Sequence, residues 1–232
     1  MITFDSACVL AEGSPGTPDV QILGPVDLRL AEHRVAVIGA NGSGKSTLAR
    51  LVNGLVHPTA GRVLVDGLDP ARDGAAVRRL VGFVFTDPDA QLVMPTPRED
   101  VALSLRRLRV DTATRADRVH AVLERFGLAR LADVSVYSLS GGQKQLLALA
   151  GVLATEPSIL VCDAPTTLLD LHWRRVVGEL LDSLDQQVLL VTHDLDVAAR
   201  ADRVLVVDGG LIVADGAAPG AVESYRARMA AR

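Results

Sequence analysis

The sequence contains little cysteine and few aromatic residues. Among its 232 residues there are only two cysteines, Cys8 and Cys162, which are far apart and show no metal-ligand spacing. This pattern excludes a disulfide framework or a zinc site of the usual kind and indicates a reducing compartment. Aromatic residues make up 3% of the chain. Binding that depends on stacking against rings therefore has few candidate residues.

Long apolar runs and a basic charge balance are also missing. The longest apolar candidate, residues 146–154, is far shorter than the roughly 18 residues that a membrane span requires. The N-terminal stretch MITFDSACVLAEGS has no basic region and no long apolar core, so we expect no signal peptide. A net charge of −4 argues against a nucleic acid as the main partner. If the protein works at a membrane, we expect it to do so through a partner.

Strand and helix patterns alternate along the chain. Hydrophobic residues make up 49% of the sequence, which is enough for a full core. Apolar runs predict strands at 2–9, 20–30, 35–38, 62–65, 81–85, 159–162, 188–191, 204–207 and 211–213. Helical spacing predicts one helix that opens at Lys45 and ends at Gly54. It predicts further helices at 75–79, 98–109, 112–126, 139–153 and 170–184, and a short one from 219 onward.

These patterns indicate an α/β fold with a parallel sheet. The turn signals Asp66-Gly67 and Gly209-Gly210 predict hairpins, the first of them antiparallel and lying against the parallel core. We expect one α/β core of residues 1–86 and 156–232, with a helical lobe at 87–155 inserted into it.

A glycine-rich turn between a strand and a helix is the most specific motif. The stretch GANGSGKST satisfies the phosphate-loop pattern G-x-x-x-x-G-K-[ST] in the required strand–turn–helix context. Its backbone N–H groups would surround an anion at the helix N-terminus. Lys45 would reach the β- and γ-phosphates, and the Ser46 hydroxyl would ligate Mg²⁺. The predicted phosphate-binding residues are Gly39, Ala40, Asn41, Gly42, Ser43, Gly44, Lys45, Ser46 and Thr47.

Two further polar residues follow buried strands. Asp163 ends the apolar run 159–162, and His193 comes directly after 188–191. In parallel sheets ligands bind outside the carboxyl ends of the strands, so both residues should converge on the phosphate loop. Asp163 has the form of a carboxylate that holds Mg²⁺, and His193 is placed to contact the γ-phosphate.

The segment LSGGQ, residues 139–143, makes a family resemblance specific. With the phosphate loop, Asp163, the TTLLD segment ending at Asp170 and His193, it resembles the ATP-binding subunits of ATP-binding cassette (ABC) transporters over essentially the whole chain. The resemblance implies a P-loop NTPase fold with a RecA-like core, ATP and Mg²⁺ as ligands, and a head-to-tail dimer. In such a dimer Ser140, Gly141 and Gly142 bind the γ-phosphate held by a second subunit. The resemblance also implies that Gln143 and Asp170 belong to this nucleotide-binding site.

A narrower resemblance is to the ATPases of energy-coupling-factor (ECF) importers for vitamins and metal ions, of the cobalt and biotin type. It depends on D-P-D-x-Q at 87–91 and E-D-V-A at 99–102. It implies a transmembrane coupling subunit and a substrate-binding membrane protein as partners, and a position at the cytoplasmic face of the membrane. Leu92, Val93 and Met94 form either a docking groove for the coupling subunit or ordinary lobe packing.

The sequence departs from the family pattern at three places. Ala164 replaces the Glu that activates the attacking water, and loss of a general base typically costs about 10²- to 10⁴-fold in rate. We therefore expect binding of ATP and Mg²⁺ with slow hydrolysis. Thr86 replaces a Gln that reaches Mg²⁺, so it could act only through an added water. The aromatic residue that stacks on adenine is missing near Leu10 and Ala11, which predicts loose base recognition and competition by guanine nucleotides.

Ala164 leaves two explanations open. It is either an introduced trapping substitution or the natural residue of a non-hydrolysing subunit that pairs with an active one. The chain is accordingly an ATPase that drives an ECF-type importer, or an inert nucleotide-binding subunit that supports a partner. Soluble ABC ATPases of DNA repair or translation are disfavoured, because the coiled-coil insertion, zinc-binding insertion or second cassette that they need is absent.

Overall fold

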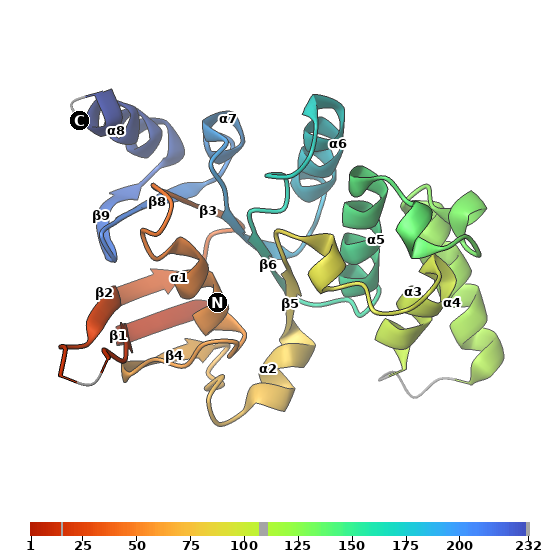
Figure 1. The fold of residues 1–232 in the computed structure, drawn as a ribbon, viewed down its shortest axis with the longest axis horizontal. Coiled ribbons are helices and arrows are strands. Elements are labelled where there is room, and N and C mark those ends of the chain that lie inside the picture. The colour runs from red at the N-terminus through yellow and green to blue at the C-terminus, as the bar shows by residue number, and fades with distance from the viewer. Residues whose placement is uncertain (15, 107–110, 231–232) are drawn as a thin grey trace.

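The computed structural model describes residues 1–14, 16–106 and 111–230. Figure 1 shows two sheets on one side of the molecule and a group of helices on the other. The strands are β1 (Ile2–Ala11), β2 (Val20–Leu30), β3 (Arg34–Ile38), β4 (Ala60–Val65), β5 (Val81–Val84), β6 (Ile159–Asp163), β7 (Gln187–Val191), β8 (Arg203–Asp208) and β9 (Leu211–Gly216). The α-helices are α1 (Lys45–Val52), α2 (Gly74–Leu80), α3 (Pro97–Leu105), α4 (Thr112–Arg125), α5 (Gly141–Leu153), α6 (Leu171–Asp182), α7 (Leu195–Ala198) and α8 (Ala218–Ala230).

The larger sheet has six strands in the order β5-β6-β7-β3-β8-β9. All neighbours in it are parallel except β8 and β9, which form the hairpin predicted at Gly209-Gly210. Side chains of β3 alternate between two buried clusters. Val35 and Val37 pack with α1, whereas Ala36 and Ile38 pack with α7 and α8. Burial on both faces explains why the central strands are continuous apolar runs.

The smaller sheet is antiparallel, with three strands in the order β2-β1-β4. A hairpin at Asp66-Gly67 implies that β4 pairs with a strand directly after this turn. The structure instead pairs β4 antiparallel with β1, with Ile2 opposite Val65. A single bridge between Val65 and Leu68 closes the turn, because Pro70 has no N–H to extend a ladder. Residues of both sheets and of α1 share one buried cluster, so α1 packs between them (Figure 1).

Helices α3, α4 and α5 form the group at the other end of the molecule (Figure 1). Helix α3 begins at Pro97, where the Thr96 side chain accepts a hydrogen bond from the Glu99 N–H. It ends at Leu105, earlier than the predicted helix 98–109, and residues 107–110 lie outside the described part of the chain. The division into a core and an inserted lobe at 87–155 stays a prediction.

Most helix predictions need only small corrections. Helix α6 spans Leu171–Asp182, because Asp170 is its N-cap rather than its first residue. The last helix is not short: α8 has 13 residues. Helix α7 was not predicted; it is a single turn that begins after Asp194, whose carboxylate accepts hydrogen bonds from the N–H groups of Asp196 and Val197. Such short helices carry little periodic signal.

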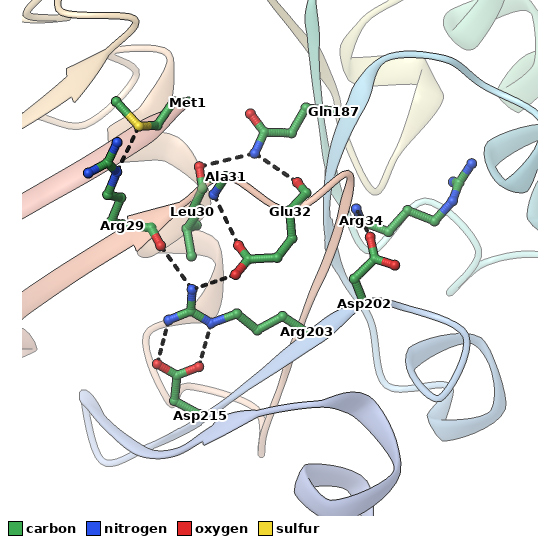
Figure 2. A network of polar contacts seen from close by, with 10 residues as sticks. All are labelled: Met1, Arg29, Leu30, Ala31, Glu32, Arg34, Gln187, Asp202, Arg203 and Asp215. Carbon is green, nitrogen blue, oxygen red and sulfur yellow. Dashed lines mark hydrogen bonds and ion pairs between the residues drawn. The ribbon is translucent and has the colours of Figure 1, made fainter.

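Arg203 links the two sheets at the start of β8 (Figure 2). Its guanidinium makes two hydrogen bonds to Asp215 on β9, each 2.6 Å long. It also contacts the Glu32 carboxylate at 3.0 Å and the Arg29 carbonyl oxygen at 2.9 Å. These contacts raise the pKa of Arg203 above its ordinary value, mainly through the hydrogen bonds to Asp215. They fix the turn between β2 and β3, and β3 in turn leads into the phosphate loop.

Candidate functional site

The sheet order places three segments side by side. Strands β6, β7 and β3 are consecutive neighbours, and their carboxyl ends lead into Asp163, into Thr192-His193 and into the loop that starts at Gly39. The predicted convergence of these segments at one edge therefore follows directly from the strand order. Residues far apart in the sequence meet here because parallel neighbours share a carboxyl end.

Glycines shape the loop after β3. Gly39, Gly42 and Gly44 have φ values of 148°, 73° and 104°, a region that side chains strongly disfavour. A Cβ on Gly39 would lie 2.0 Å from the Val207 carbonyl oxygen, and one on Gly44 would lie 2.7 Å from that of Ile22. Gly44 is also the N-cap of α1 and provides no side-chain cap. The N–H groups of the first turn are left for another acceptor, which suits an anion.

Lys45 and Ser43 supply polar groups inside this loop. Lys45 is buried, and its Nζ donates to the Ala40 carbonyl oxygen at 2.6 Å. Burial lowers the pKa of Lys45, and the nearby Asp163 carboxylate opposes that shift. The Ser43 hydroxyl is buried and has no hydrogen-bond partner among the described residues. A phosphate group in the loop would supply acceptors for both side chains, so the residues fit such a ligand.

Around this centre, Asn41 and Gly42 are exposed at the tip of the loop, and Ala40 and Thr47 are half-buried beside it. The predicted residues thus form one continuous turn around the start of α1. They are held by backbone hydrogen bonds, including Ser43 N–H to Ala40 O at 3.3 Å and Gly210 N–H to Ser43 O at 3.0 Å.

Asp163 is the meeting point of β6 and α1. Its carboxylate is almost fully buried, and Oδ1 accepts a hydrogen bond from the Ser46 hydroxyl at 2.7 Å. The other oxygen, Oδ2, lies 3.2 Å from Nη2 of Arg50. Sequence reasoning missed Arg50, although its spacing of four residues from Ser46 on α1 could have indicated a shared face. A hydroxyl and a carboxylate in contact are suitable ligands for Mg²⁺.

Thr86 lies on the other side of Asp163. Its hydroxyl donates to the Asp163 carbonyl oxygen at 2.6 Å, so it is tied to the backbone of β6. The preceding peptide is held by two amide side chains. Gln91 accepts from the Phe85 N–H and donates to the Ala148 carbonyl oxygen, both at 3.2 Å, and the fully buried Gln145 donates to the Phe85 carbonyl oxygen at 3.5 Å. These contacts join the end of β5 to α5.

His193 and Ala164 face the same edge of the sheet. Burial lowers the pKa of His193, and the positive charge of Lys45 lowers it further, so the imidazole is neutral near neutral pH. Ala164 has a φ of 52°, and its N–H donates to the Val191 carbonyl oxygen at 3.0 Å. This left-handed conformation costs a residue with a side chain about 1 kcal/mol, and such strain clusters at functional sites. The methyl group of Ala164 cannot accept a proton.

A polar cavity of about 160 Å³ lies beside His193. Its lining residues are Thr166, Thr167, Arg174, Thr192, His193 and Asp194. The cavity joins the segment after Ala164 to the segment after β7. It provides room for a polar ligand next to the imidazole.

The LSGGQ segment forms a second helix N-terminus. Ser140 is the N-cap of α5 and shares a capping box with Gln143, with hydrogen bonds of 3.3 and 2.8 Å. Gly141 is open to solvent, and Gly142 packs on Trp173. Asp170 is the N-cap of α6. Figure 1 shows α5 separated from α1 by β5 and β6, so the structure does not bring this segment to the phosphate loop of the same chain.

The end of the β1–β2 hairpin is the place where the family has an adenine-stacking aromatic residue, and here it carries aliphatic residues. Ala11 pairs with Val20, which is 58% exposed, and Leu10 pairs with Gln21. The aromatic residue of these two strands, Phe4, is buried in the core.

None of the described helices has the length and apolar character needed to cross a bilayer.

Comparisons with known proteins agree with this arrangement. A family profile described as ABC transporter matches residues 23–167. The biotin transport ATP-binding protein BioM of Rhizobium etli is 44% identical over 88% of this chain and 91% of its own. The energy-coupling factor transporter ATP-binding protein EcfA1 of Halalkalibacterium halodurans is 41% identical over 78% of this chain and 67% of its own.

A solved structure shows the same fold. It is the dimeric, post-hydrolysis state of the ATP-binding cassette MJ0796, bound to ADP and phosphate. The two structures have a TM-score of 0.83 at 28% identity, over 95% of this chain and 100% of the other.

Proposed function

Because this chain belongs to the ABC transporter family, whose ATP-binding subunits hydrolyse ATP, we propose that it is the ATP-binding subunit of an ECF-type importer for a vitamin or a metal ion. The ECF assignment is supported by the 87–102 motifs and by the likeness to EcfA1 and BioM. We assign the whole of residues 1–232 to one ABC ATPase domain, with residues 87–155 as its helical lobe.

The contact between Ser46 and Asp163 is the observation that carries the proposal. It joins the phosphate loop to the end of β6 at 2.7 Å, which is the pairing that a Mg²⁺–nucleotide site needs. The loop N–H groups and Lys45 would hold the phosphates, and Ser46 and Asp163 would hold Mg²⁺, with Thr86 reaching it through water. Bound Mg²⁺ neutralises charge on the phosphate oxygens. The neutral His193 would donate a hydrogen bond to the γ-phosphate.

A second subunit completes the site. The Ser140 hydroxyl accepts from the Gln143 N–H but keeps its own proton for donation. The N–H groups of Gly141 and Gly142 lie in the first turn of α5, where they have no acceptor within the helix. The phosphate loop of the same chain lies elsewhere, so these donors suit a triphosphate held by another copy or by a relative. Asp170 caps the adjoining helix at the same face. This geometry and the dimeric relative support a head-to-tail dimer.

The membrane partners would meet the helical lobe. The backbone N–H groups of Val93 and Met94 both donate to Oδ2 of the buried Asp100, at 2.9 and 3.0 Å. Val93 is 68% exposed, whereas Leu92 packs into the lobe. A fixed loop that presents an apolar side chain suits a coupling subunit at the cytoplasmic face of the membrane. A separate substrate-binding membrane protein would then choose the cargo, and no nucleic-acid partner is involved.

Ala164 favours a second candidate function. A chain without a general base can serve as a non-hydrolysing subunit whose LSGGQ segment completes the site of an active partner. In both functions the chain binds MgATP, and the two differ in whether its own site hydrolyses it. The aliphatic surface at Ala11 and Val20 leads to weak discrimination between ATP and GTP in either case.

Calorimetric titration with MgATP tests the shared premise. We expect saturable binding by the chain and a loss of binding in Lys45→Ala. Lys144→Ala is the control, because it removes a lysine that lies outside the phosphate loop and pairs with Asp89. Co-purification with the membrane proteins encoded by the same organism tests the transport assignment. Absence of MgATP binding at millimolar concentration would overturn both candidate functions, and binding without any membrane partner would overturn the importer.

A further inference from the structure

The single tryptophan of the chain lies against the LSGGQ segment. Trp173 belongs to the first turn of α6, and a Cβ placed on Gly142 would lie 2.0 Å from its Cδ2 atom and 2.2 Å from its Cγ atom. Both are atoms of the indole ring system. The backbone of Gly142 therefore lies directly on the indole, with no room for any side chain between them.

Trp173 is also attached to the loop before α6. Its backbone N–H donates to the Asp170 carboxylate at 2.9 Å, and the next residue, Arg174, donates through Nε to the Leu169 carbonyl oxygen at 2.8 Å. Farther along α6, Val177 and Leu181 are buried in the cluster that also contains Leu139. Trp173 thus connects two segments through different groups: its backbone N–H contacts the Asp170 side chain, and its indole contacts the start of α5. In the sequence these segments are separated by most of a helix and a strand.

We infer that Trp173 is a positioning residue that holds the N–H groups at the start of α5 in a fixed direction relative to the Asp170 loop. The inference depends on the proposed function, in which Ser140, Gly141 and Gly142 bind a triphosphate held by a second subunit. Because Trp173 touches Gly142 and not the ligand, its effect is on closure of the dimer and not on the chain's own phosphate loop.

Removal of the indole leaves an empty space beneath Gly142. The first turn of α5 can then tilt, and displacement of binding groups by about 1 Å can cost 10²-fold when several donors must act together. Val176 offers a matched control, because it lies on the same helix and packs into the same cluster. Val176→Ala also removes apolar packing from α6, but it leaves the contact with Gly142 intact.

The test compares nucleotide binding with dimer formation in the full chain. MgATP binding to the monomer is followed by calorimetry, and dimer formation by analytical ultracentrifugation at saturating MgATP. We expect Trp173→Ala to keep the monomer affinity within about twofold and to raise the dimer dissociation constant about tenfold or more. Trp173→Phe should restore most of the dimer, and Val176→Ala should dimerise as the parent does.

The tryptophan also provides a spectroscopic readout. Since the chain has a single tryptophan, its emission reports the surroundings of Trp173 alone, which are Gly142, the neighbouring His172 ring and the apolar cluster. The emission of the parent protein should change over the MgATP range in which the dimer forms. Unchanged emission, or full dimerisation of Trp173→Ala, would overturn the inference while the proposed function stood. Failure of the parent protein to bind MgATP would instead remove the proposed function. If Trp173→Ala does not fold, Trp173→Phe and the emission of the parent protein still decide the question.

Discussion

The Ser46 hydroxyl donates a 2.7 Å hydrogen bond to the Asp163 carboxylate, although the two residues are 117 positions apart in the chain. The contact depends on two structural facts: the phosphate loop joins β3 directly to α1, and β6 lies two strands away from β3 in the same sheet. The same carboxylate is shared by Arg50. Charge at this point is therefore balanced by protein groups, and a bound cation would change that balance.

Restoring a carboxylate at position 164 should restore hydrolysis. We expect Ala164→Glu to raise the steady-state rate of phosphate release about 10²- to 10⁴-fold, because the new side chain can accept a proton from the attacking water. Ala164→Gln has nearly the same size but no basic oxygen, and it should remain slow. The rates are measured with the chain alone and with a partner ATPase. No gain in Ala164→Glu would favour the inert-subunit function.

Removing the Arg50 guanidinium should destabilise the nucleotide-free protein more than the MgATP-bound protein. Arg50→Met removes the guanidinium that pairs with the buried Asp163 carboxylate, at a cost of about 1–3 kcal/mol. Bound Mg²⁺ would compensate that charge and shrink the loss. Thermal unfolding with and without MgATP measures both values. Arg175→Met, which removes an exposed arginine of α6, is the control. An equal loss in both conditions would contradict the expectation.

His193 should titrate below the ordinary histidine pKa of 6.5, because burial and Lys45 disfavour its protonated form. The folded chain then binds fewer protons than the unfolded chain, so unfolding free energy falls as the pH drops below 6.5. NMR titration of the imidazole gives the pKa directly. His193→Gln should flatten the loss of stability on acidification. Lys45→Met should raise the His193 pKa, and an unchanged value would exclude Lys45 as a cause.

Arg203 should matter more for stability than a surface arginine with similar contacts. Arg203→Ala removes hydrogen bonds to Asp215, to Glu32 and to the Arg29 carbonyl oxygen, and leaves two partly buried carboxylates close together. We expect a loss of about 2 kcal/mol or more in urea unfolding. Arg98 also makes a double contact, with Asp133, but at an exposed site. Arg98→Ala should lose much less, and equal losses would refute the role of burial.

Local patterns predicted much of the fold and of the candidate site. The phosphate loop, Asp163 and His193 could be found because each follows an apolar run, and parallel strands share a carboxyl end. The roles of Gly39 and Gly44 follow from the motif, and their φ values agree with it. The LSGGQ segment was correctly placed at the start of a helix.

Contacts between distant segments could not be predicted from the sequence. The pairing of β4 with β1 depends on the packing of α1 between the two sheets, and the turn at Asp66-Gly67 suggested a nearer partner. Arg50 and Gln145 act through side-chain contacts with other elements, and neither belongs to a motif. The position of Trp173 on Gly142 likewise arises only when α5 and α6 pack together.

The strand order also determines when the pocket can assemble during synthesis. Strands β1, β2 and β4 all lie within the first 65 residues, so the small sheet has its partners early. Strand β3, which carries the phosphate loop, has β7 and β8 as its neighbours, and these end at Val191 and Asp208. During synthesis on the ribosome, β3 thus stays unpaired until β7 has emerged, well over a hundred residues later, and chaperones that bind apolar β-segments would contact β3 during that time.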